Sequence, residues 1–549
     1  MQSILFLIPP IMSYDRYVNP GFNERLVKKG DRTFGNPVTD MPLGLISMSA
    51  YLKKHEEVKI KLIDFNILMS KRSHFEYDSY SKFFGEVLAD SFRIDGKPDF
   101  VGISALFTTA YYNMIDLAER VREMVPTACI TAGGGVPTNL YERIFKDCDA
   151  FDALCFGEGE IPFLELVRAR DITAVLESRA SWITPQKVKQ GDRFAYEFIT
   201  DLDEIPFYDY SILDYKAYAF NPTLTNTSSF SVQSSPFHFA TSRGCPHKCC
   251  FCASHSVHGR KMRYYSVQRV REDLTRLKNE YGARIIGFQD DHLTAKRART
   301  YEIIQILKKL DLKPYFQNGL TMKTLDREML ETMKAAGVTE LTLPIESGSD
   351  RVLKEIMHKP LDLSIVDRVV KDCRELGIDT YINILIGLPG ETKRDMDDAL
   401  VFLKTLDVTW FRVVVAAPLV GSEMLNICLE NNYLTGDYIG CDFKHAVVST
   451  EEFTAEFIEQ KAYEMNLELN FVENSDFRLK NYEKALAGFE NVIRVSVDHA
   501  FGYYFAAKCC DALGDTKKYR AYAERYAAIV AADEFWKKKS ARFGVPEFA

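Results

Sequence analysis

Three closely spaced cysteines are the residues of this sequence that point most directly to chemistry. Cys245, Cys249 and Cys252 form the pattern CxxxCxxC within the segment TSRGCPHKCCFCASH. Thiolate sulfur is a soft ligand that favours iron-sulfur clusters or zinc. Structural zinc takes four protein ligands, whereas a cluster held by three cysteines keeps one iron open for a substrate or cosubstrate. Cys250 is not expected to be a fourth ligand, because its side chain diverges from that of its neighbour Cys249.

A zinc knuckle with three cysteines and one histidine is the alternative that these residues leave open. His247, His255 or His258 would then be the fourth ligand. Such knuckles rarely lie at the head of a series of strand and helix units, which is where this loop is found. The surroundings of the loop therefore favour an iron-sulfur cluster.

The cysteine loop follows the first of six apolar segments between His238 and about Pro418. With helical patterns between them, these segments are FHFAT, RIIGFQD, KPYFQN, VTELTLPIE, IDTYINILIG and WFRVVVAAP. Six successive βα units with right-handed crossovers predict a partial or full (β/α) barrel of the TIM type. The loops at the carboxyl ends of its strands are expected to carry the chemistry.

A second alternation of strands and helices occupies residues 3–168. Its apolar segments SILFLI, VKIKLIDF, DFVGIS, ACITAG and DALCF predict a doubly wound, Rossmann-like parallel sheet, since continuous apolar runs indicate strands covered on both faces. Ligands of such sheets bind beyond the carboxyl ends of the strands. The glycine-rich loops 133–135 and 157–160 lie at such ends, where glycine allows a bulky ligand to approach, although glycine is also common in plain turns.

The rest of the chain consists of connecting and helical segments. The segment WITPQKVKQGDRFAYEFI predicts a small hairpin that turns at Gln190-Gly191-Asp192, and the polar stretch TLTNTSSFSVQSSP follows it. The segment around residues 475–535 resembles a tetratricopeptide-type helical hairpin that turns at Gly514-Asp515, and a plain helical tail remains the alternative. We therefore expect a Rossmann-like domain over 1–170, a connector over 171–235, a barrel over 236–425, a barrel-covering segment over 426–470 and a helical region over 471–549.

The overall composition excludes several classes of protein. Of the 549 residues, 46% are hydrophobic and 27% charged, which is typical of globular domains rather than disordered chains. A net charge of −8 gives no general attraction to nucleic acid or to anionic membranes, and no apolar run is long enough to span a bilayer. SILFLIPPI lacks the basic start of a signal peptide, and twelve cysteines are few for a disulfide scaffold. These features predict a cytoplasmic location.

At the cysteine loop the chain resembles the radical S-adenosylmethionine (SAM) superfamily, over about residues 236–425. In that family CxxxCxxC holds a 4Fe-4S cluster whose open iron binds the amino and carboxylate groups of SAM. The resemblance implies that Cys245, Cys249 and Cys252 hold such a cluster. It also implies contacts to SAM beside the third cysteine and at three strand ends, from Phe251, Gln289, Asp290, Asp291, Glu346, Ser347, Gly387 and Pro389.

The first 168 residues resemble the cobalamin-binding domain that precedes the barrel in one large branch of this superfamily. The resemblance implies that cobalamin contacts Leu43, Gly44, Ser104, Gly133, Gly134, Gly135, Gly157, Glu158 and Gly159. Cobalamin mutases with a DxHxxG loop after their first strand use its histidine as an axial ligand. The corresponding segment here, IPPIMSYDRYVNPGFNERL, contains no histidine, so cobalamin is expected base-off, without histidine ligation from this loop.

Together the two resemblances imply an enzyme that makes a 5′-deoxyadenosyl radical and transfers a methyl group from methylcobalamin to an unactivated carbon. Two alternatives stay open. One is a radical enzyme with another outcome, such as cyclisation, oxidation, ring rearrangement or carbon-carbon coupling, in which cobalamin has a non-methyl role or is absent. The other is a non-catalytic cobalamin or SAM sensor. The expected partners are a small-molecule, lipid or peptide substrate and an electron donor such as flavodoxin or ferredoxin. A protein contact through the C-terminal helices is a further expectation.

Overall fold

The structure, a computed structural model, describes residues 1–21, 26–37, 39–218 and 236–548. These residues form two compact units. The first unit comprises Met1–Asn318, Pro418–Asn432 and Asp437–Asp442. The second comprises Gly319–Ala417, Tyr433–Gly436 and Phe443–Ala549.

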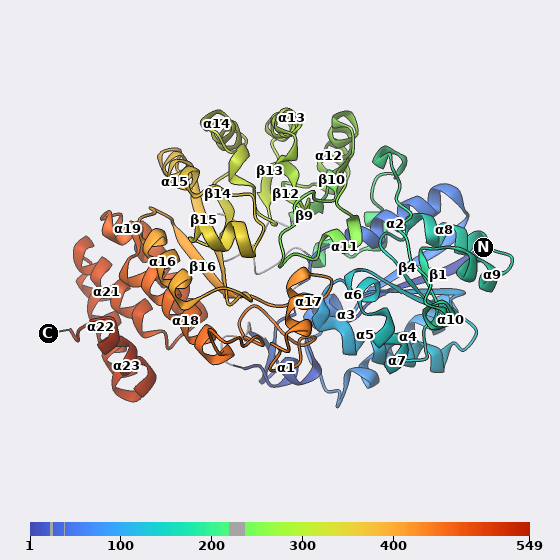
Figure 1. Cartoon of the computed structure of the whole chain (residues 1–549), viewed down its shortest axis with the longest axis horizontal. Coiled ribbons are helices and arrows are strands. Elements are labelled where there is room, and N and C mark those ends of the chain that lie inside the picture. The colour runs from blue at the N-terminus through green and yellow to red at the C-terminus, as the bar shows by residue number, and fades with distance from the viewer. Residues whose placement is uncertain (22–25, 38, 219–235, 549) are drawn as a thin grey trace. The chain divides into compact units, whose positions relative to one another are not determined.

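A six-stranded sheet forms the centre of the N-terminal part of the first unit. Its order is β4-β1-β5-β6-β7-β8, and all neighbours are parallel except the last pair. Figure 1 labels its neighbouring strands β4 and β1. The strands are β1 (Gln2–Ile8), β4 (Val58–Asp64), β5 (Phe100–Ser104), β6 (Cys129–Gly133), β7 (Ala153–Cys155) and β8 (Trp182–Ile183). Consecutive residues of β1, from Ile4 to Leu7, are buried, because both faces of this strand are covered. The five strands expected from the sequence are confirmed.

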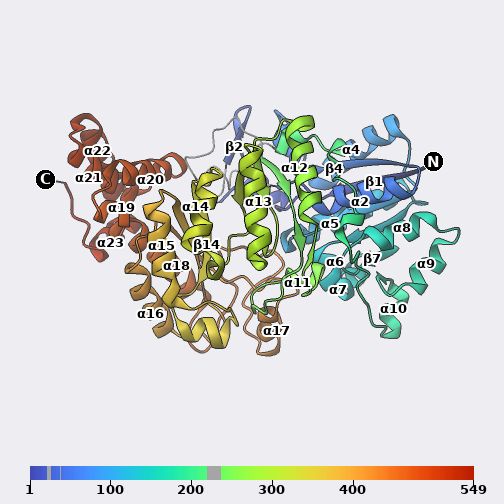
Figure 2. The ribbon, with the colours of Figure 1, turned by 90° about the horizontal axis from the view of Figure 1, so that it is seen from above.

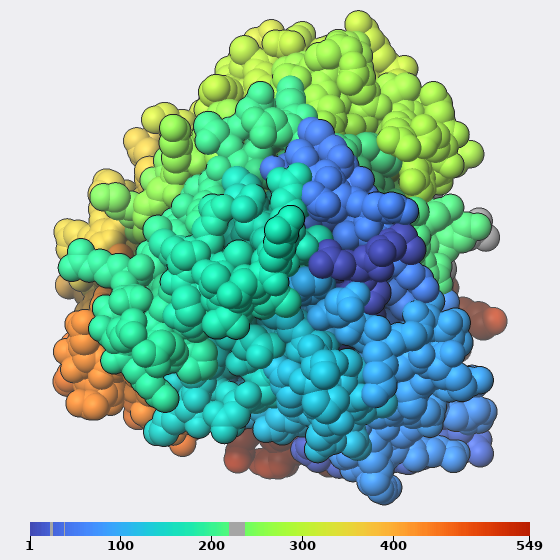
Figure 3. Space-filling view, turned by 90° about the vertical axis from the view of Figure 1, so that its right-hand side faces the viewer, coloured from blue at the N-terminus to red at the C-terminus, as the bar shows by residue number. Residues whose placement is uncertain are grey.

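Helices lie on both faces of this sheet. The pair α2 (Leu43–His55) and α8 (Glu160–Arg168) packs together, as does the pair α4 (Tyr80–Asp95) and α5 (Tyr111–Met124), and the two pairs cover opposite faces (Figures 1 and 2). In the space-filling view, the blue to teal residues of this sheet and its helices form most of the face toward the viewer (Figure 3). The expected doubly wound, Rossmann-like architecture is therefore present.

The prediction of a hairpin after this sheet is wrong. Trp182 and Ile183 form β8, which extends the sheet by pairing antiparallel with β7. The next residues form the helix α10 (Pro185–Gln190), which begins at the N-cap Thr184 and ends at Gly191 in the left-handed conformation. Gly191 therefore ends a helix rather than turning a hairpin. Residues 219–235 of the expected connector lie outside the described part of the chain.

The first three barrel strands belong to the first unit. They are β9 (Pro236–Phe239), β12 (Ile285–Phe288) and β13 (Lys313–Phe316), parallel to one another in the order β13-β12-β9. The helices α12 (Val267–Tyr281) and α13 (Arg297–Lys309) pack side by side along them (Figure 2). The antiparallel pair β10 (Ser242–Arg243) and β11 (Arg263–Tyr264) and the short helix α11 (His255–His258) interrupt the series after β9.

The other three barrel strands lie in the second unit. They are β14 (Glu340–Glu346), β15 (Asp379–Ile386) and β16 (Trp410–Val415), parallel in that order, with helices α14 (Arg327–Ala335), α15 (Val366–Glu375) and α16 (Lys393–Lys404). The helix α18 (Ala455–Leu467) and the turn after it follow the outer edge of β16. Asn470 exchanges two hydrogen bonds with the backbone of Phe411, and Asn466 does the same with Val413. These amides take the place of a neighbouring strand, so the edge of the sheet stays paired.

The end of the chain is helical, as expected. Its helices are α20 (Tyr482–Val495), α21 (Ala500–Leu513), α22 (Thr516–Ala532) and α23 (Glu534–Arg542). They share one apolar core around Phe489, Phe501 and Trp536, and α21 ends at Gly514, where the sequence predicted the turn. None of the helices in the described residues is both long and apolar enough to cross a membrane.

Candidate active site

The cysteine loop is a long excursion closed at its base by β10 and β11. Arg243, the last residue before the loop, is paired with Arg263, the first residue after it. Gly244 opens the loop with a φ of +92°, and a Cβ atom there would lie 2.7 Å from the carbonyl oxygen of Lys261. The two ends of the loop can approach this closely only because residue 244 is glycine.

The three predicted cluster ligands lie on this loop with half-buried side chains. The backbone N–H of Cys252 donates to the carbonyl of Cys249 at 3.1 Å, which makes the second half of the loop a tight turn. Burial raises the pKa of the Cys245 thiol to about 11, and the negative charges of Asp291, Cys252 and Cys249 contribute to this rise. The three thiols therefore share one electrostatic neighbourhood.

This environment fits a cationic iron-sulfur centre. A bound metal would neutralise the repulsion among the thiolates and draw off their protons. Among the described residues, no three His, Cys, Asp or Glu side chains are already gathered closely enough to hold a metal ion. The fit to an iron-sulfur cluster therefore rests on the chemistry of the donors, which are three soft thiols on one loop whose ends are held close together at Gly244.

Cys250 differs from its three neighbours in its surroundings. Its residue is only 2% exposed, and its carbonyl accepts a hydrogen bond of 2.9 Å from the backbone N–H of Met424, in the first turn of α17 (Glu423–Glu430). Burial raises the pKa of its thiol to about 12. A thiol buried to this extent packs as a small apolar side chain.

Two of the predicted SAM contacts follow β12 and have different surroundings. The Asp290 carboxylate is buried and accepts hydrogen bonds from the backbone N–H and Oγ1 of Thr241 and from Oγ of Ser242, at 2.5 to 3.1 Å. Asp290 thus holds the segment just before the cysteine loop, and its contact with SAM stays a prediction. Asp291 is half-buried beside the loop, as is Phe251, and their contacts with SAM also stay predictions.

Gln289 belongs to a chain of hydrogen bonds that the sequence did not reveal. Its amide Nε2 donates to Oε1 of Gln317 at 2.7 Å, and Nε2 of Gln317 donates to the Asp40 carboxylate at 2.6 Å. The other Asp40 oxygen lies 3.6 Å from Nε2 of the buried His238, whose Nδ1 accepts from the backbone N–H of Met41. The chain thereby joins the ends of β12 and β13 to the segment that begins α2. No short-range sequence signal indicates it, because Met41 and His238 are 197 positions apart.

The glycines predicted to contact cobalamin lie at the carboxyl edge of the N-terminal sheet. Gly134 has a φ of +106°, and a Cβ atom there would lie 2.6 Å from the carbonyl oxygen of Ala105. A Cβ atom on Gly135 would lie 2.9 Å from the carbonyl oxygen of Leu106. These glycines therefore let the loops after β5 and β6 touch. Leu106 itself is 60% exposed beside them, an apolar surface at the edge where ligands of this fold bind.

The remaining predicted cobalamin contacts surround the same edge. Ser104 ends β5, Leu43 and Gly44 begin α2, and a Cβ atom on Gly44 would meet nothing within 4 Å. Gly133 ends β6 and has ordinary contacts. An edge of this shape, with glycines, open space and exposed apolar side chains, fits a flat corrin ring. The contacts themselves stay predictions.

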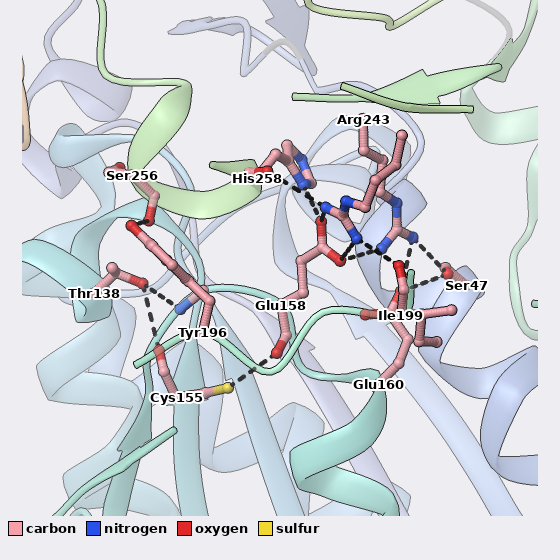
Figure 4. Close-up of polar contacts among 12 residues, drawn as sticks. Ser47, Thr138, Cys155, Glu158, Glu160, Tyr196, Ile199, Arg243, Ser256 and His258 are labelled. Atoms are coloured by element: carbon pink, nitrogen blue, oxygen red, sulfur yellow. Dashed lines mark hydrogen bonds and ion pairs between the residues drawn. The ribbon is translucent and has the colours of Figure 1, made fainter. Parts of the chain in front are cut away.

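Glu158, in contrast, is buried in a network of charged groups (Figure 4). Its carboxylate accepts from Arg243 at 2.9 Å and from Arg263 at 2.5 and 2.9 Å, and it lies 2.7 Å from Nδ1 of His258. Burial alone would raise its pKa, but Arg243, His258 and Arg263 hold that pKa well below its ordinary range. The neighbouring Gly157 has a φ of +88°, and a Cβ atom there would collide with the ring of Tyr196. A Cβ atom on Gly159 would lie 3.2 Å from the sulfur of Met48.

The predicted SAM contacts of the second unit lie at the ends of β14 and β15. Glu346 ends β14 with a φ of +71°, and its carboxylate lies 3.5 Å from Nζ of Lys359. The buried Ser347 accepts a hydrogen bond from the backbone N–H of Ser349. Gly387 follows β15 with a φ of +91°, and its N–H donates to the buried carboxylate of Glu391 at 2.7 Å. Pro389 is buried in the same turn. These four contacts with SAM remain predictions.

Comparison with known proteins matches two parts of the chain to known families. Residues 239–403 match the radical SAM superfamily, and residues 38–167 match the B12 binding domain. The fold and the cysteine loop thus define a radical SAM enzyme. The chain belongs to the cobalamin-dependent radical SAM family, and the cofactors of that family are a 4Fe-4S cluster, SAM and cobalamin.

Two curated relatives are methyltransferases by name. An uncharacterized methyltransferase of Pyrococcus horikoshii is 29% identical over 371 residues, which is 67% of this chain and 78% of that protein. The cytidylyl-2-hydroxyethylphosphonate methyltransferase of Streptomyces wedmorensis is 29% identical over 372 residues, or 61% of this chain and 68% of that protein.

A solved structure has a similar fold. It is the radical SAM methyltransferase TsrM of Kitasatospora setae, solved with cobalamin and a [4Fe-4S] cluster. The likeness covers 97% of this chain and 100% of that one, with a TM-score of 0.56 and 16% sequence identity. At this identity the comparison supports the fold alone.

Proposed function

We propose that this enzyme methylates an unactivated carbon of its substrate. When bound, the cluster and SAM supply a 5′-deoxyadenosyl radical that removes a hydrogen atom, and cobalamin supplies the methyl group. The observation that carries the proposal is that the three-cysteine loop and the glycine-lined edge of the B12-binding sheet belong to one compact unit. The two relatives that are methyltransferases by name support methyl transfer as the outcome.

In this proposal Cys245, Cys249 and Cys252 hold the cluster. The SAM molecule on its open iron is contacted by Phe251, Gln289 and Asp291, which belong to the same compact unit as the cysteine loop. The contacts of Glu346, Ser347, Gly387 and Pro389 with SAM stay predictions. Asp290 acts through Thr241 and Ser242, which it holds in place before the cysteine loop. A donor set of soft thiols, a polar amide and carboxylates suits a cluster with one open iron and a charged amino acid.

Cobalamin would lie against the carboxyl edge of the N-terminal sheet. Pro9 and Pro10 follow β1 directly, and neither they nor the residues up to Phe22 offer an imidazole. We therefore propose a base-off cobalamin without histidine ligation from this loop. The exposed Leu106 and the open space at Gly44 support an apolar contact surface for the ring.

The cluster assignment is tested by exchanging single cysteines in anaerobically reconstituted protein. Cys249→Ala is expected to lose cluster iron, the broad visible absorbance and the formation of 5′-deoxyadenosine from SAM under strong reductant. Cys250→Ala is the matched control, because the neighbouring thiol is buried and makes no expected metal contact. It should retain all three properties.

Two results would contradict the assignment. One is a full cluster absorbance with SAM cleavage in Cys249→Ala. The other is wild-type protein, purified without oxygen, that contains tetrahedral zinc and no iron. The second result would revive the zinc-knuckle alternative with a histidine as the fourth ligand.

A further inference from the structure

The residue Glu158 has an environment that cofactor contact does not explain. It lies between Gly157 and Gly159 in the loop after β7, at the edge where cobalamin is expected. Its side chain is 3% exposed, and both carboxylate oxygens are engaged by groups from the other part of the unit (Figure 4). A carboxylate in this state has no capacity left for a corrin ring.

All three partners of Glu158 belong to the frame of the cysteine loop. Arg243 precedes the loop, Arg263 follows it, and His258 ends the helix α11 within it. Arg263 binds Glu158 with two nitrogen atoms, at 2.5 and 2.9 Å, and also donates to the carbonyl of Ile199. Such two-point contacts between guanidinium and carboxylate fix both distance and orientation.

The pairing of β10 with β11 creates the need for this carboxylate. Arg243 and Arg263 stand directly opposite each other, and like charges at such positions repel. Both are almost completely buried, so water cannot screen the repulsion. Glu158 accepts from both guanidinium groups and turns the repulsion into attraction.

A second carboxylate completes the charge balance on the side of the N-terminal sheet. Glu160, the first residue of α8, accepts from Arg243 at 2.7 Å, and Ser47 of α2 joins both residues with hydrogen bonds of 2.6 and 2.9 Å. Two buried guanidinium groups thus face two buried carboxylates. The loop after β7 and the helices of the N-terminal sheet are in this way tied to the base of the cysteine loop.

We propose that Glu158 is a positioning residue that clamps the two ends of the cysteine loop and ties them to the cobalamin-binding edge. This inference deepens the proposed function, on which it rests. Glu158 does not touch a cofactor. Occupation of the edge by cobalamin restrains the loop after β7, and through Glu158 it also restrains residues 244–262.

The test is hydrogen exchange in the full-length protein with its reconstituted cluster, with and without added hydroxocobalamin. In the wild type, cobalamin is expected to slow exchange in residues 244–262. In Glu158→Gln, exchange in that segment should be about tenfold faster, and cobalamin should no longer slow it. Iron content and binding of cobalamin to the protein are measured in the same samples.

A matched control is available in the second unit. Glu464 is equally buried and binds Lys539 at 2.7 Å and Arg542 at 2.6 Å. Glu464→Gln removes the same charge from beside two cations, the buried Lys539 and the more exposed Arg542, so it reports the general cost of removing a buried carboxylate charge. It should leave exchange in residues 244–262 at the wild-type rate.

Arg263→Lys is the second variant, in case Glu158→Gln does not fold. It keeps the charge but loses the two-point contact, and an intermediate exchange rate is expected. Wild-type exchange rates in residues 244–262 of both Glu158→Gln and Arg263→Lys would overturn the clamp. If the wild type binds no cobalamin, the proposed function fails, and the difference between variant and wild type without cobalamin still decides whether the clamp exists.

Discussion

At the scale of single residues, the burial of a side chain indicates whether it positions neighbouring protein groups or is free to contact a cofactor. Glu158, Asp290 and Glu464 are carboxylates whose oxygens are already used by neighbouring side chains or backbone groups. Removing one partner from a buried ion pair typically costs about 3–5 kcal/mol, because the other charge is left without compensation. Gln289 and Asp291 are less buried and keep capacity for a ligand. Burial therefore divides the residues that the sequence had grouped as one set of cofactor contacts.

His499 allows a prediction about pH. Its ring stacks on Phe471 and meets the edge of Trp536, and its Nδ1 accepts the backbone N–H of Gly502 at the start of α21. Burial lowers the pKa of His499 from 6.5 to about 4. The unfolded chain therefore binds more protons than the folded one between these two values, and stability falls as the pH drops through this window.

The wild type is expected to lose roughly 2 kcal/mol of unfolding free energy from His499 between pH 7 and pH 5. His499→Asn keeps an N-cap acceptor and removes the titrating ring, so this part of the pH dependence should disappear. The measurement is urea unfolding of both proteins at the two pH values. Equal losses of stability in the two proteins would contradict the assignment.

At the scale of elements, the loops after β5 and β6 approach each other closely because Gly134 has no side chain, and this contact can be tested. Gly134→Ala would force a Cβ atom against the Ala105 carbonyl at a φ of +106°. The expected cost is about 3 kcal/mol of unfolding free energy, from strain and overpacking together. Gly191→Ala is the control, because its φ of +73° is also positive but nothing lies within 4 Å.

Gly191→Ala should cost only about 1 kcal/mol, since the left-handed conformation is its sole penalty. Denaturant unfolding of both variants measures the difference. A similar small loss for Gly134→Ala would show that the loops after β5 and β6 can separate. That result would remove the argument that glycine shapes this edge of the sheet.

Element ends show which local signals in the sequence are reliable. Five of the six strands of the N-terminal sheet and the six barrel strands were predicted, because apolar runs bounded by turn residues are strong local signals. The hairpin around Gly191 was predicted wrongly, because glycine ends a helix as readily as it turns a hairpin. The asparagine pairing along β16 was not predicted either, since Asn466 and Asn470 meet that strand only after the chain has folded.

At the scale of the whole molecule, the two compact units divide the six barrel strands equally. β9, β12 and β13 belong with the N-terminal sheet, whereas β14, β15 and β16 belong with the C-terminal helices. Domain ranges drawn from sequence similarity therefore differ from the compact units of the folded chain. The first unit holds both the cysteine loop and the edge of the N-terminal sheet where we propose that cobalamin binds.

The proposed reaction predicts a balance of products for the whole enzyme. Methyl transfer consumes SAM in two ways, so substrate turnover should give equal amounts of 5′-deoxyadenosine and S-adenosylhomocysteine, together with a product heavier by one methylene group. Mass spectrometry with SAM labelled in its methyl group measures all three. 5′-Deoxyadenosine without S-adenosylhomocysteine would instead support cyclisation or oxidation.

The sequence by itself determined the kind of chemistry and the order of the elements. Three thiols at fixed spacing and two series of apolar runs are local properties, and local properties can be read from neighbouring residues. Only the tertiary structure showed that Glu158 accepts hydrogen bonds from Arg243 and Arg263. It also showed that Gln289 is hydrogen-bonded to Gln317, which in turn donates to Asp40. The physical reason is that burial and charge pairing depend on residues brought together from distant parts of the chain.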